Sequence, residues 1–402
     1  MSSLPSRRQF LHGAAAAAAL ASASQVTARA NTSPATSARP VPGEERDRQL
    51  KEPFDGTHQA GIATPAQHHL VLLGFDLKPE VQAEDLPRLM RVWTQDARSL
   101  TQGENPPGSL EPEMAENPAG LTVTCGFGPG FFAVAGKEHL APGWLKEGLP
   151  HFSRDQLDPA YGQTDIVLQV CSNNPTTAAF VARHVVRSAT TYVSPKWTQR
   201  GFLTPDAKSS TPRNLFGQLD GTVNPRTPEK FDEQVWIDKG PEWMTGGSAM
   251  VMRRIAMNLD SWETLDRNSR EVALGRKLSD GAPLSGGQEF DDVDVRAVDK
   301  YGLPKVDRNS HAALARPAEG HPEQRLLRRA YNFDQGINDS GLVFVCYQKD
   351  PLAQFAAIQK RLDASDAMNT WVTHVGSAVY FVPPGTSKDA GDTYWGQRLL
   401  EA

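Results

Sequence analysis

Two distant stretches of the chain share one pattern of residues. Residues 166–175 read IVLQVCSNNP and residues 342–351 read LVFVCYQKDP. Each is an apolar run typical of a buried strand, followed by a short polar turn and a proline. Because proline is well tolerated at the first position of a helix, both stretches predict a strand followed by a helix. The repeat indicates an internal duplication, although unrelated strand–helix units can also resemble one another by chance.

The remaining periodicity is consistent with two copies of one unit. Strands are expected at residues 69–77, 121–127, 165–171, 249–259, 341–347 and 376–382, and helices at 86–100, 176–188 and 352–362. The pattern predicts an α+β fold with two halves, residues 51–210 and 211–402, that meet at residues 205–215. Residues 267–310 are polar and long for a loop, and long ordered loops often carry function.

The chain begins with a segment that is typical of an export signal. Arg7 and Arg8 precede a Phe-Leu pair and a short alanine-rich run, and Ala-Arg-Ala at 28–30 is a cleavage pattern. This order favours the twin-arginine route over an ordinary Sec signal, which needs only positive charge. We expect residues 1–30 to be a signal peptide and residues 31–50 to be a disordered leader. The twin-arginine route carries folded proteins, so we expect a periplasmic or extracellular protein that acquires its cofactor before export.

Composition excludes several classes of partner and site. The formal net charge is −5 over 402 residues, which argues against binding of nucleic acid or an anionic membrane surface. No segment of the mature chain is long and apolar enough to predict a transmembrane helix. Cys125, Cys171 and Cys346 each lie in an apolar run without Cys-x-x-Cys spacing, so they read as buried free thiols.

One polar stretch carries the strongest candidate for chemistry. The chain lacks a His-Glu-x-x-His motif and a phosphate-binding Gly-Lys-Ser/Thr loop. Residues 214–225, NLFGQLDGTVNP, instead place Asp220 between Gly217 and Gly221. Glycine lets the backbone turn sharply and approach a flat ligand, and an aspartate beside apolar neighbours suits acid–base catalysis. By itself, this stretch is better explained as a plain turn with an Asp-Gly pair.

Four segments together resemble the dye-decolorising peroxidase family. Residues 217–221 resemble its Gly-x-x-Asp-Gly motif, and residues 55–65, DGTHQAGIATP, resemble its N-terminal signature. Ser310-His311, followed by Pro317, resembles the segment of the proximal heme ligand. Residues 326–332, LLRRAYN, resemble the segment of the distal arginine. The likeness covers residues 50–395 and is greatest to the A-type branch, which includes exported deferrochelatase/peroxidase proteins.

The resemblance implies a fold and a cofactor. Members have duplicated ferredoxin-like halves, with antiparallel sheets, flanking helices and heme b held mainly by the C-terminal half. His311 is then expected to be the axial iron ligand, Asp220 the distal acid–base group and Arg328 the residue that stabilises developing negative charge. The remaining residues assigned to the heme pocket are Leu342 and Phe344 as its distal wall, and Asn224 and Gly221 at the heme edge.

The resemblance also implies an activity, with alternatives. We expect a peroxidase in which hydrogen peroxide oxidises dyes, phenols or other reductants, small or macromolecular. A deferrochelatase that releases iron from heme for iron acquisition is the second hypothesis, and an exported binding protein without catalysis is the third. A homo-oligomer is left open. Candidates for relaying electrons from bulky reductants are Trp262, Trp371, Tyr380, Tyr394 and Trp395.

Two departures from the family pattern affect these expectations. Ala312 and Ala313 follow His311, where the family commonly has Ile or Val and then Arg. Gln218 and Leu219 stand before Asp220, where deferrochelatase-like members often have Phe-Lys. The first departure bears on contacts at the heme edge more than on ligation by His311.

Overall fold

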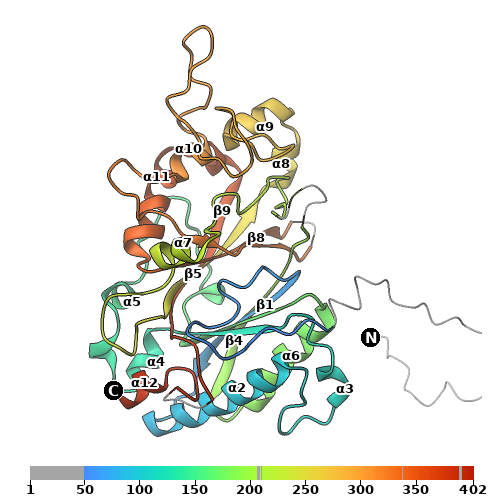
Figure 1. Ribbon diagram of the computed structural model, residues 1–402, viewed down its shortest axis with the longest axis vertical. Coiled ribbons are helices and arrows are strands. Elements are labelled where there is room, and N and C mark those ends of the chain that lie inside the picture. The colour runs from blue at the N-terminus through green and yellow to red at the C-terminus, as the bar shows by residue number, and fades with distance from the viewer. Residues whose placement is uncertain (1–48, 206–208, 210, 337, 389–391) are drawn as a thin grey trace, which may run out of the picture. The chain divides into compact units, whose positions relative to one another are not determined.

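The first half of the chain forms a four-stranded antiparallel sheet with two long helices (Figure 1). The computed structural model describes residues 49–205, 209, 211–336, 338–388 and 392–402. The strands are arranged in the order β4-β1-β3-β2. Helix α2 follows β1 and helix α6 follows β3, which is the ferredoxin-like βαββαβ arrangement. The bounds are β1 His69–Leu77, α2 Leu86–Thr101, β2 Thr122–Phe127, β3 Ile166–Ser172, α6 Pro175–Ser188 and β4 Val193–Phe202.

The second half repeats this arrangement. Strand β5 lies between β8 and β9, and the short strands β6 and β7 both pair with β8. Helices α8, α9 and α10 come between β5 and β6 in the chain, and α11 comes between β8 and β9. The predicted α+β fold with duplicated ferredoxin-like halves is therefore confirmed. The bounds are β5 Ser248–Met257, α8 Leu259–Glu263, α9 Arg267–Leu274, α10 His311–Ala315, β6 Leu327–Arg328, β7 Tyr331–Asp334, β8 Ser340–Gln348, α11 Ala357–Ser365 and β9 Val372–Val382.

The two sheets are joined at their edges and enclose a shared core. Strand β2 meets β9, and β4 meets β7, each through a single residue pair. Along β1, Leu70 and Leu72 belong to the core between the sheets, whereas Val71, Leu73 and Phe75 pack in the cluster that contains the helices. Strands β1, β3 and β8 are buried on both faces for most of their length, and their sequences are continuous apolar runs rather than alternating ones.

The predicted elements are present within about four residues of their expected bounds, but three strands were missed. Strand β4, VSPKWTQRGF, is mostly polar because its outer face is exposed, as at Thr198, Arg200 and Phe202. Strands β6 and β7 are too short to give a period. The expected helix at 352–362 begins with a π-helical turn, η4 (Leu352–Ala356), before α11. The polar stretch 267–310 begins with helix α9.

The rest of the described chain consists of short elements and loops. All three cysteines are buried and free, as predicted.

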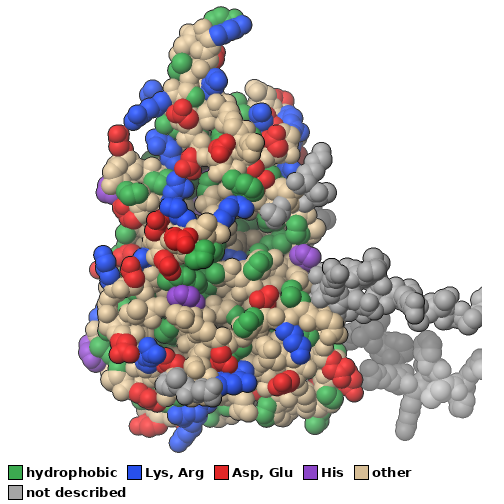
Figure 2. Space-filling view, viewed as in Figure 1, with side chains coloured by type: hydrophobic (Ala, Val, Ile, Leu, Met, Phe, Trp, Pro, Cys, Tyr) green, Lys and Arg blue, Asp and Glu red, His purple; other side chains and the backbone are tan. Residues whose placement is uncertain are grey.

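Basic and acidic side chains are interspersed on the face seen in Figure 2. Across the described ranges, no helix combines the length and apolar character that crossing a membrane requires. The predicted signal peptide and all but the last two residues of the predicted leader lie outside the described residues. The short helices are η1 Ala83–Asp85, α3 Pro112–Ala115, α4 Pro129–Val134, η2 Glu138–Leu140, α5 Gly143–Glu147, η3 Pro159–Tyr161, α7 Pro228–Gln234, η5 Ala367–Thr370 and α12 Gln397–Glu401.

Candidate active site

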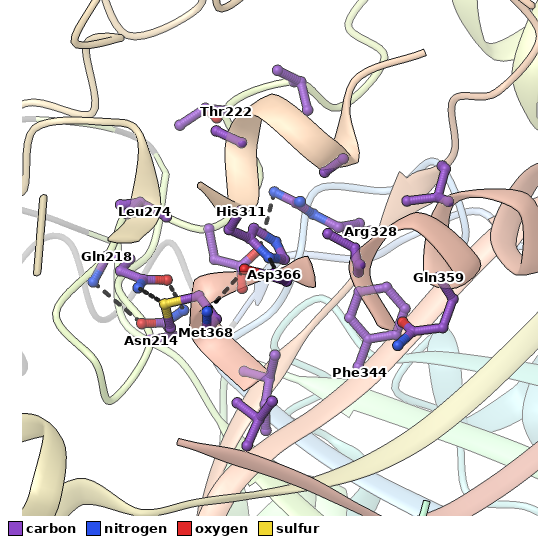
Figure 3. A pocket seen from close by; sticks show the side chains of 18 of the residues that line it. Asn214, Gln218, Thr222, Leu274, His311, Arg328, Phe344, Gln359, Asp366 and Met368 are labelled. Atoms are coloured by element: carbon purple, nitrogen blue, oxygen red, sulfur yellow. Dashed lines mark hydrogen bonds and ion pairs between the residues drawn. The ribbon is translucent and has the colours of Figure 1, made fainter. Parts of the chain in front are cut away.

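A large cavity lies in the second half, lined by strands β5, β8 and β9 and by helices α10 and α11 (Figure 3). The cavity opens to solvent, and it encloses about 1590 Å³ when the space of its open mouth is included. Its lining is mainly apolar and includes Ile255, Ile358 and Leu362. Leu342 and Phe344, both predicted wall residues, line it from β8. The cavity therefore suits a mostly apolar ligand.

His311 enters this cavity as the first residue of α10. Its Nδ1 lies 2.6 Å from Oδ2 of Asp366, and a third of its side chain is exposed. Burial opposes protonation of the ring, but the charge of Asp366 and its hydrogen bond outweigh burial and raise the pKa of His311. With Nδ1 donating to the carboxylate, Nε2 is the ring nitrogen left for a ligand or metal.

Asp366 is itself held in place by the backbone around it. Its Oδ1 accepts a hydrogen bond of 2.9 Å from the N–H of Met368 at the start of η5, and the side chain is almost fully buried. The sequence analysis missed Asp366, because an aspartate at this position reads as an ordinary helix cap. Its partnership with His311 spans 55 residues of the chain and left no local signal.

Asp220 and Arg328 also face the cavity and are paired with each other. Arg328 Nη2 lies 3.2 Å from Asp220 Oδ1, and both side chains are largely buried. Asp220 lies in a turn between Gly217 (φ +81°) and Gly221 (φ +119°), which adopt backbone conformations that favour glycine. Arg328 comes from β6. Its Nε is buried without a hydrogen-bond partner in the described part of the chain, which is uncommon for a buried polar atom.

Asn224 contacts the backbone of Arg328 and does not itself line the cavity. Its Nδ2 donates to the Arg328 carbonyl oxygen (2.7 Å), and its Oδ1 accepts from the Arg328 N–H (3.0 Å). Neither Asn224 nor Gly221 lines the cavity. A side chain at position 221 would approach Asn224 Nδ2 to 3.2 Å. The structure therefore gives these two residues, predicted at the heme edge, a place behind the Asp220–Arg328 pair.

Arginines besides Arg328 also line the cavity, among them Arg276, Arg316 and Arg325. Arg276 is buried and donates to three backbone carbonyls of the loop that follows α9, so its position is fixed. Arg325 pairs with Asp292 at 2.7 Å. This cationic part of the lining suits a ligand that carries carboxylates, because guanidinium groups bind carboxylates well.

The aromatic relay candidates are mostly buried. Trp262, Tyr380, Tyr394 and Trp395 are each at most 2 % exposed. Trp371 is partly exposed and contacts Trp262 edge to face, with ring centroids 5.1 Å apart. Trp371 directly precedes Val372, which lines the cavity. Of the five candidates, the Trp262–Trp371 pair therefore has both a partly exposed member, Trp371, and a position next to the cavity lining.

Comparison with known proteins agrees with this geometry. Family models described as "Dyp-type peroxidase, N-terminal" and "Dyp-type peroxidase, C-terminal" match residues 59–203 and 211–387. A dye-decolorizing peroxidase of Thermobifida fusca is 34% identical over 98% of this chain and 97% of its own. A deferrochelatase of Escherichia coli K12 is 34% identical over 88% of both chains. The crystal structure of a DyP-type peroxidase from Cellulomonas bogoriensis, 46% identical, matches with a TM-score of 0.84 over 89% of this chain and 99% of its own. The chain therefore belongs to the Dyp-type peroxidase family of heme enzymes.

Proposed function

We propose that this enzyme holds heme b in the described cavity, with His311 as the axial iron ligand, and uses hydrogen peroxide to oxidise dyes, phenols or other reductants. The observation that carries the proposal is the His311–Asp366 pair, which shares one cavity lining with the Asp220–Arg328 pair. The apolar lining fits a porphyrin, Nε2 of His311 fits its iron, and the lining arginines fit its propionates. When bound, heme supplies the iron-centred redox chemistry that cleaves peroxide.

Each side chain has a defined task in this proposal. The Asp220 carboxylate would accept a proton from one oxygen of hydrogen peroxide and return it to the other oxygen, which would leave as water. The Arg328 guanidinium stabilises the negative charge that develops as the O–O bond breaks. Leu342 and Phe344 keep bulk water from these two groups. Asn224 fixes the backbone of Arg328, so it acts through Arg328 rather than through heme.

Release of iron from heme is the alternative, and the His311–Asp366 pair favours peroxidase activity over it. A carboxylate at hydrogen-bond distance from Nδ1 makes an imidazole more electron-donating. Such a ligand binds oxidised iron more strongly, which supports oxidation chemistry and opposes loss of iron. Family membership removes the third hypothesis, a binding protein without catalysis, because the family consists of heme enzymes.

One experiment separates the two activities. The purified protein is incubated with excess heme and a reductant, and released iron and free protoporphyrin are measured beside peroxide-dependent oxidation of a dye. We expect the wild type to oxidise the dye without forming stoichiometric protoporphyrin, and we expect Asp220→Asn to lose the dye oxidation. Protoporphyrin formed at the same rate by the wild type and by Asp220→Asn, without dye oxidation by either, would establish the deferrochelatase instead.

Export by the twin-arginine route and the two-domain division remain part of the proposal. Arg7 and Arg8 are the residues on which export depends. In a host with this pathway, replacing both with lysine is expected to leave the protein in the cytoplasm. Unchanged export of that variant, measured by cell fractionation, would show that a Sec-type signal is sufficient.

A further inference from the structure

Arg361, on α11, binds the end of the short helix that carries His311. Its Nε donates to the carbonyl oxygen of Leu314 at 3.1 Å, and its Nη2 donates to that of Arg316 at 2.9 Å. The last carbonyls of a helix have no partner within the helix. A guanidinium is well suited to this place, because its planar donors satisfy several acceptors at once and its charge complements the negative end of the helix.

The same side chain also reaches the cavity lining. Arg361 Nη1 donates to Oε1 of Gln324 at 2.6 Å and to the carbonyl oxygen of Ala357, one turn earlier in α11. Gln324 is buried and lines the cavity. A single side chain on α11 thus fixes the C-terminal end of α10 and a residue of the cavity lining.

Residues just after α11 also hold the opposite, N-terminal end of α10. Asp366, just after α11, binds the ring of His311, and the N–H of Ala367 donates to the carbonyl oxygen of Asn309 at 2.9 Å. Helix α10 has only five residues, one of them buried, and no side-chain cap at Ser310. So short a helix has little stability of its own, and its position depends on these external bonds.

The π-helical turn η4 sets the face that α11 presents. In η4 the Ala356 N–H donates to the carbonyl oxygen of Pro351, five residues earlier, at 2.8 Å. One extra residue in a turn rotates the rest of a helix by about 100°. With this rotation, Ile358 and Leu362 line the cavity while Arg361 reaches α10.

From these contacts we infer that Arg361 is a positioning residue for the axial ligand: it holds α10 so that His311 and Asp366 stay aligned with the iron. The inference rests on the proposed function in one respect, the assignment of His311 as the ligand. It assigns to Arg361 a measurable effect on the iron–imidazole bond, although Arg361 itself does not line the cavity.

The test compares three variants of the heme-loaded protein. Arg361→Gln removes the charge and most of the donors, Arg361→Lys keeps the charge with a single donor group, and Lys360→Gln changes the exposed neighbour on the same helix. Two quantities are measured: the rate of heme transfer to excess apomyoglobin, and the iron–imidazole stretching frequency of the ferrous protein by resonance Raman spectroscopy. We expect heme loss about 10–100-fold faster and a lower frequency for Arg361→Gln, intermediate values for Arg361→Lys and wild-type values for Lys360→Gln.

Two outcomes would overturn the inference. One is a wild-type frequency and heme-loss rate in Arg361→Gln. The other is a lower melting temperature with both quantities unchanged, which would make Arg361 a purely structural residue. If Arg361→Gln does not fold, Arg361→Lys decides the matter by the same two readouts. Failure of the ligand assignment is separate, since it would appear as an unchanged iron–imidazole band in His311→Gly.

Discussion

The imidazole Nδ1 of His311 lies 2.6 Å from Oδ2 of Asp366, a residue 55 positions away that η5 holds by a backbone hydrogen bond. This distance makes Asp366 the residue that sets both the tautomer and the electron donation of the proposed iron ligand. The neutral amide of Asp366→Asn is expected to keep heme bound but to bind oxidised iron less strongly. The ferric/ferrous potential then rises, and kcat/KM for peroxide falls about 10–100-fold.

Asp363→Asn is the matched control for this change. Asp363 lies on α11, three residues before Asp366, but binds the backbone and hydroxyl of Ser153 instead of His311. Spectroelectrochemistry and steady-state kinetics of the two variants give the comparison. Equal potentials in the wild type and Asp366→Asn would show that the carboxylate does not act on the iron.

The Asp220–Arg328 pair predicts two different defects in peroxide activation. Asp220→Asn removes the proton acceptor and is expected to slow the reaction with peroxide by about 10²–10⁴-fold. Arg328→Lys keeps a cation but loses the fixed guanidinium, and about 10²–10³-fold is expected. Stopped-flow mixing with hydrogen peroxide measures both rates, and the heme content of both variants should equal that of the wild type. Wild-type speed in Asp220→Asn would remove Asp220 from the mechanism.

Asn224 provides a test between a heme contact and a positioning role. Asn224→Ala loses two hydrogen bonds to the Arg328 backbone, which should lower the free energy of unfolding by about 1–3 kcal/mol. Peroxide activation should slow without a change in heme affinity. Asn224→Asp retains only the acceptor toward the Arg328 N–H, and we expect a defect of the same kind. Weaker heme binding with unchanged peroxide activation would instead support the contact at the heme edge that the sequence predicted.

The buried His374 is expected to make the free energy of unfolding decrease at acidic pH. Burial, and then the charge of Arg253, lowers the pKa of His374 from 6.5 to about 4, although Asp155 and Asp363 oppose this shift. Its Nδ1 has no hydrogen-bond partner among the described residues. The unfolded chain therefore takes up the proton first as the pH falls. The free energy of unfolding should decrease between pH 6.5 and about 4, by up to about 3 kcal/mol at about 1.4 kcal/mol per pH unit.

Denaturant unfolding at several pH values measures this dependence. His374→Gln should have a smaller loss of stability over the same pH interval, whereas His139→Gln, which changes an exposed histidine, should behave as the wild type. An identical pH dependence in His374→Gln and the wild type would mean that other groups cause the acid sensitivity.

The sequence predicted the fold where burial on both faces left a continuous apolar signal. Strand β1 has the bounds that were expected, and the two strand–proline–helix copies are β3 with α6 and β8 with η4 and α11. Strand β4 escaped because its outer face is exposed and its residues are polar. Local periodicity thus identifies the inner strands and helices, but not an outer strand whose place depends on pairing with distant partners.

Within the site, the three residues expected to act on peroxide or bind iron were found together, and the residues that hold His311 in place were not predicted. Asp220, Arg328 and His311 share one cavity lining, as the resemblance implied. Asp366 and Arg361 have no motif, because their partners on α10 lie 55 and about 47 residues away and only the packing of α11 brings them close. Gln218, which departs from the family pattern, likewise has a partner that is distant in the sequence: its amide contacts Met368 Sδ at 3.7 Å.

The central claim is that His311 binds the iron from one side of this cavity. The most direct measurement is the absorption and resonance Raman spectrum of His311→Gly, reconstituted with heme, before and after addition of imidazole. We predict that the variant loses the iron–imidazole band and most of its heme, and that added imidazole restores the band, the heme content and the reaction with peroxide. A variant that keeps the wild-type Soret band and iron–imidazole frequency without imidazole would contradict the account.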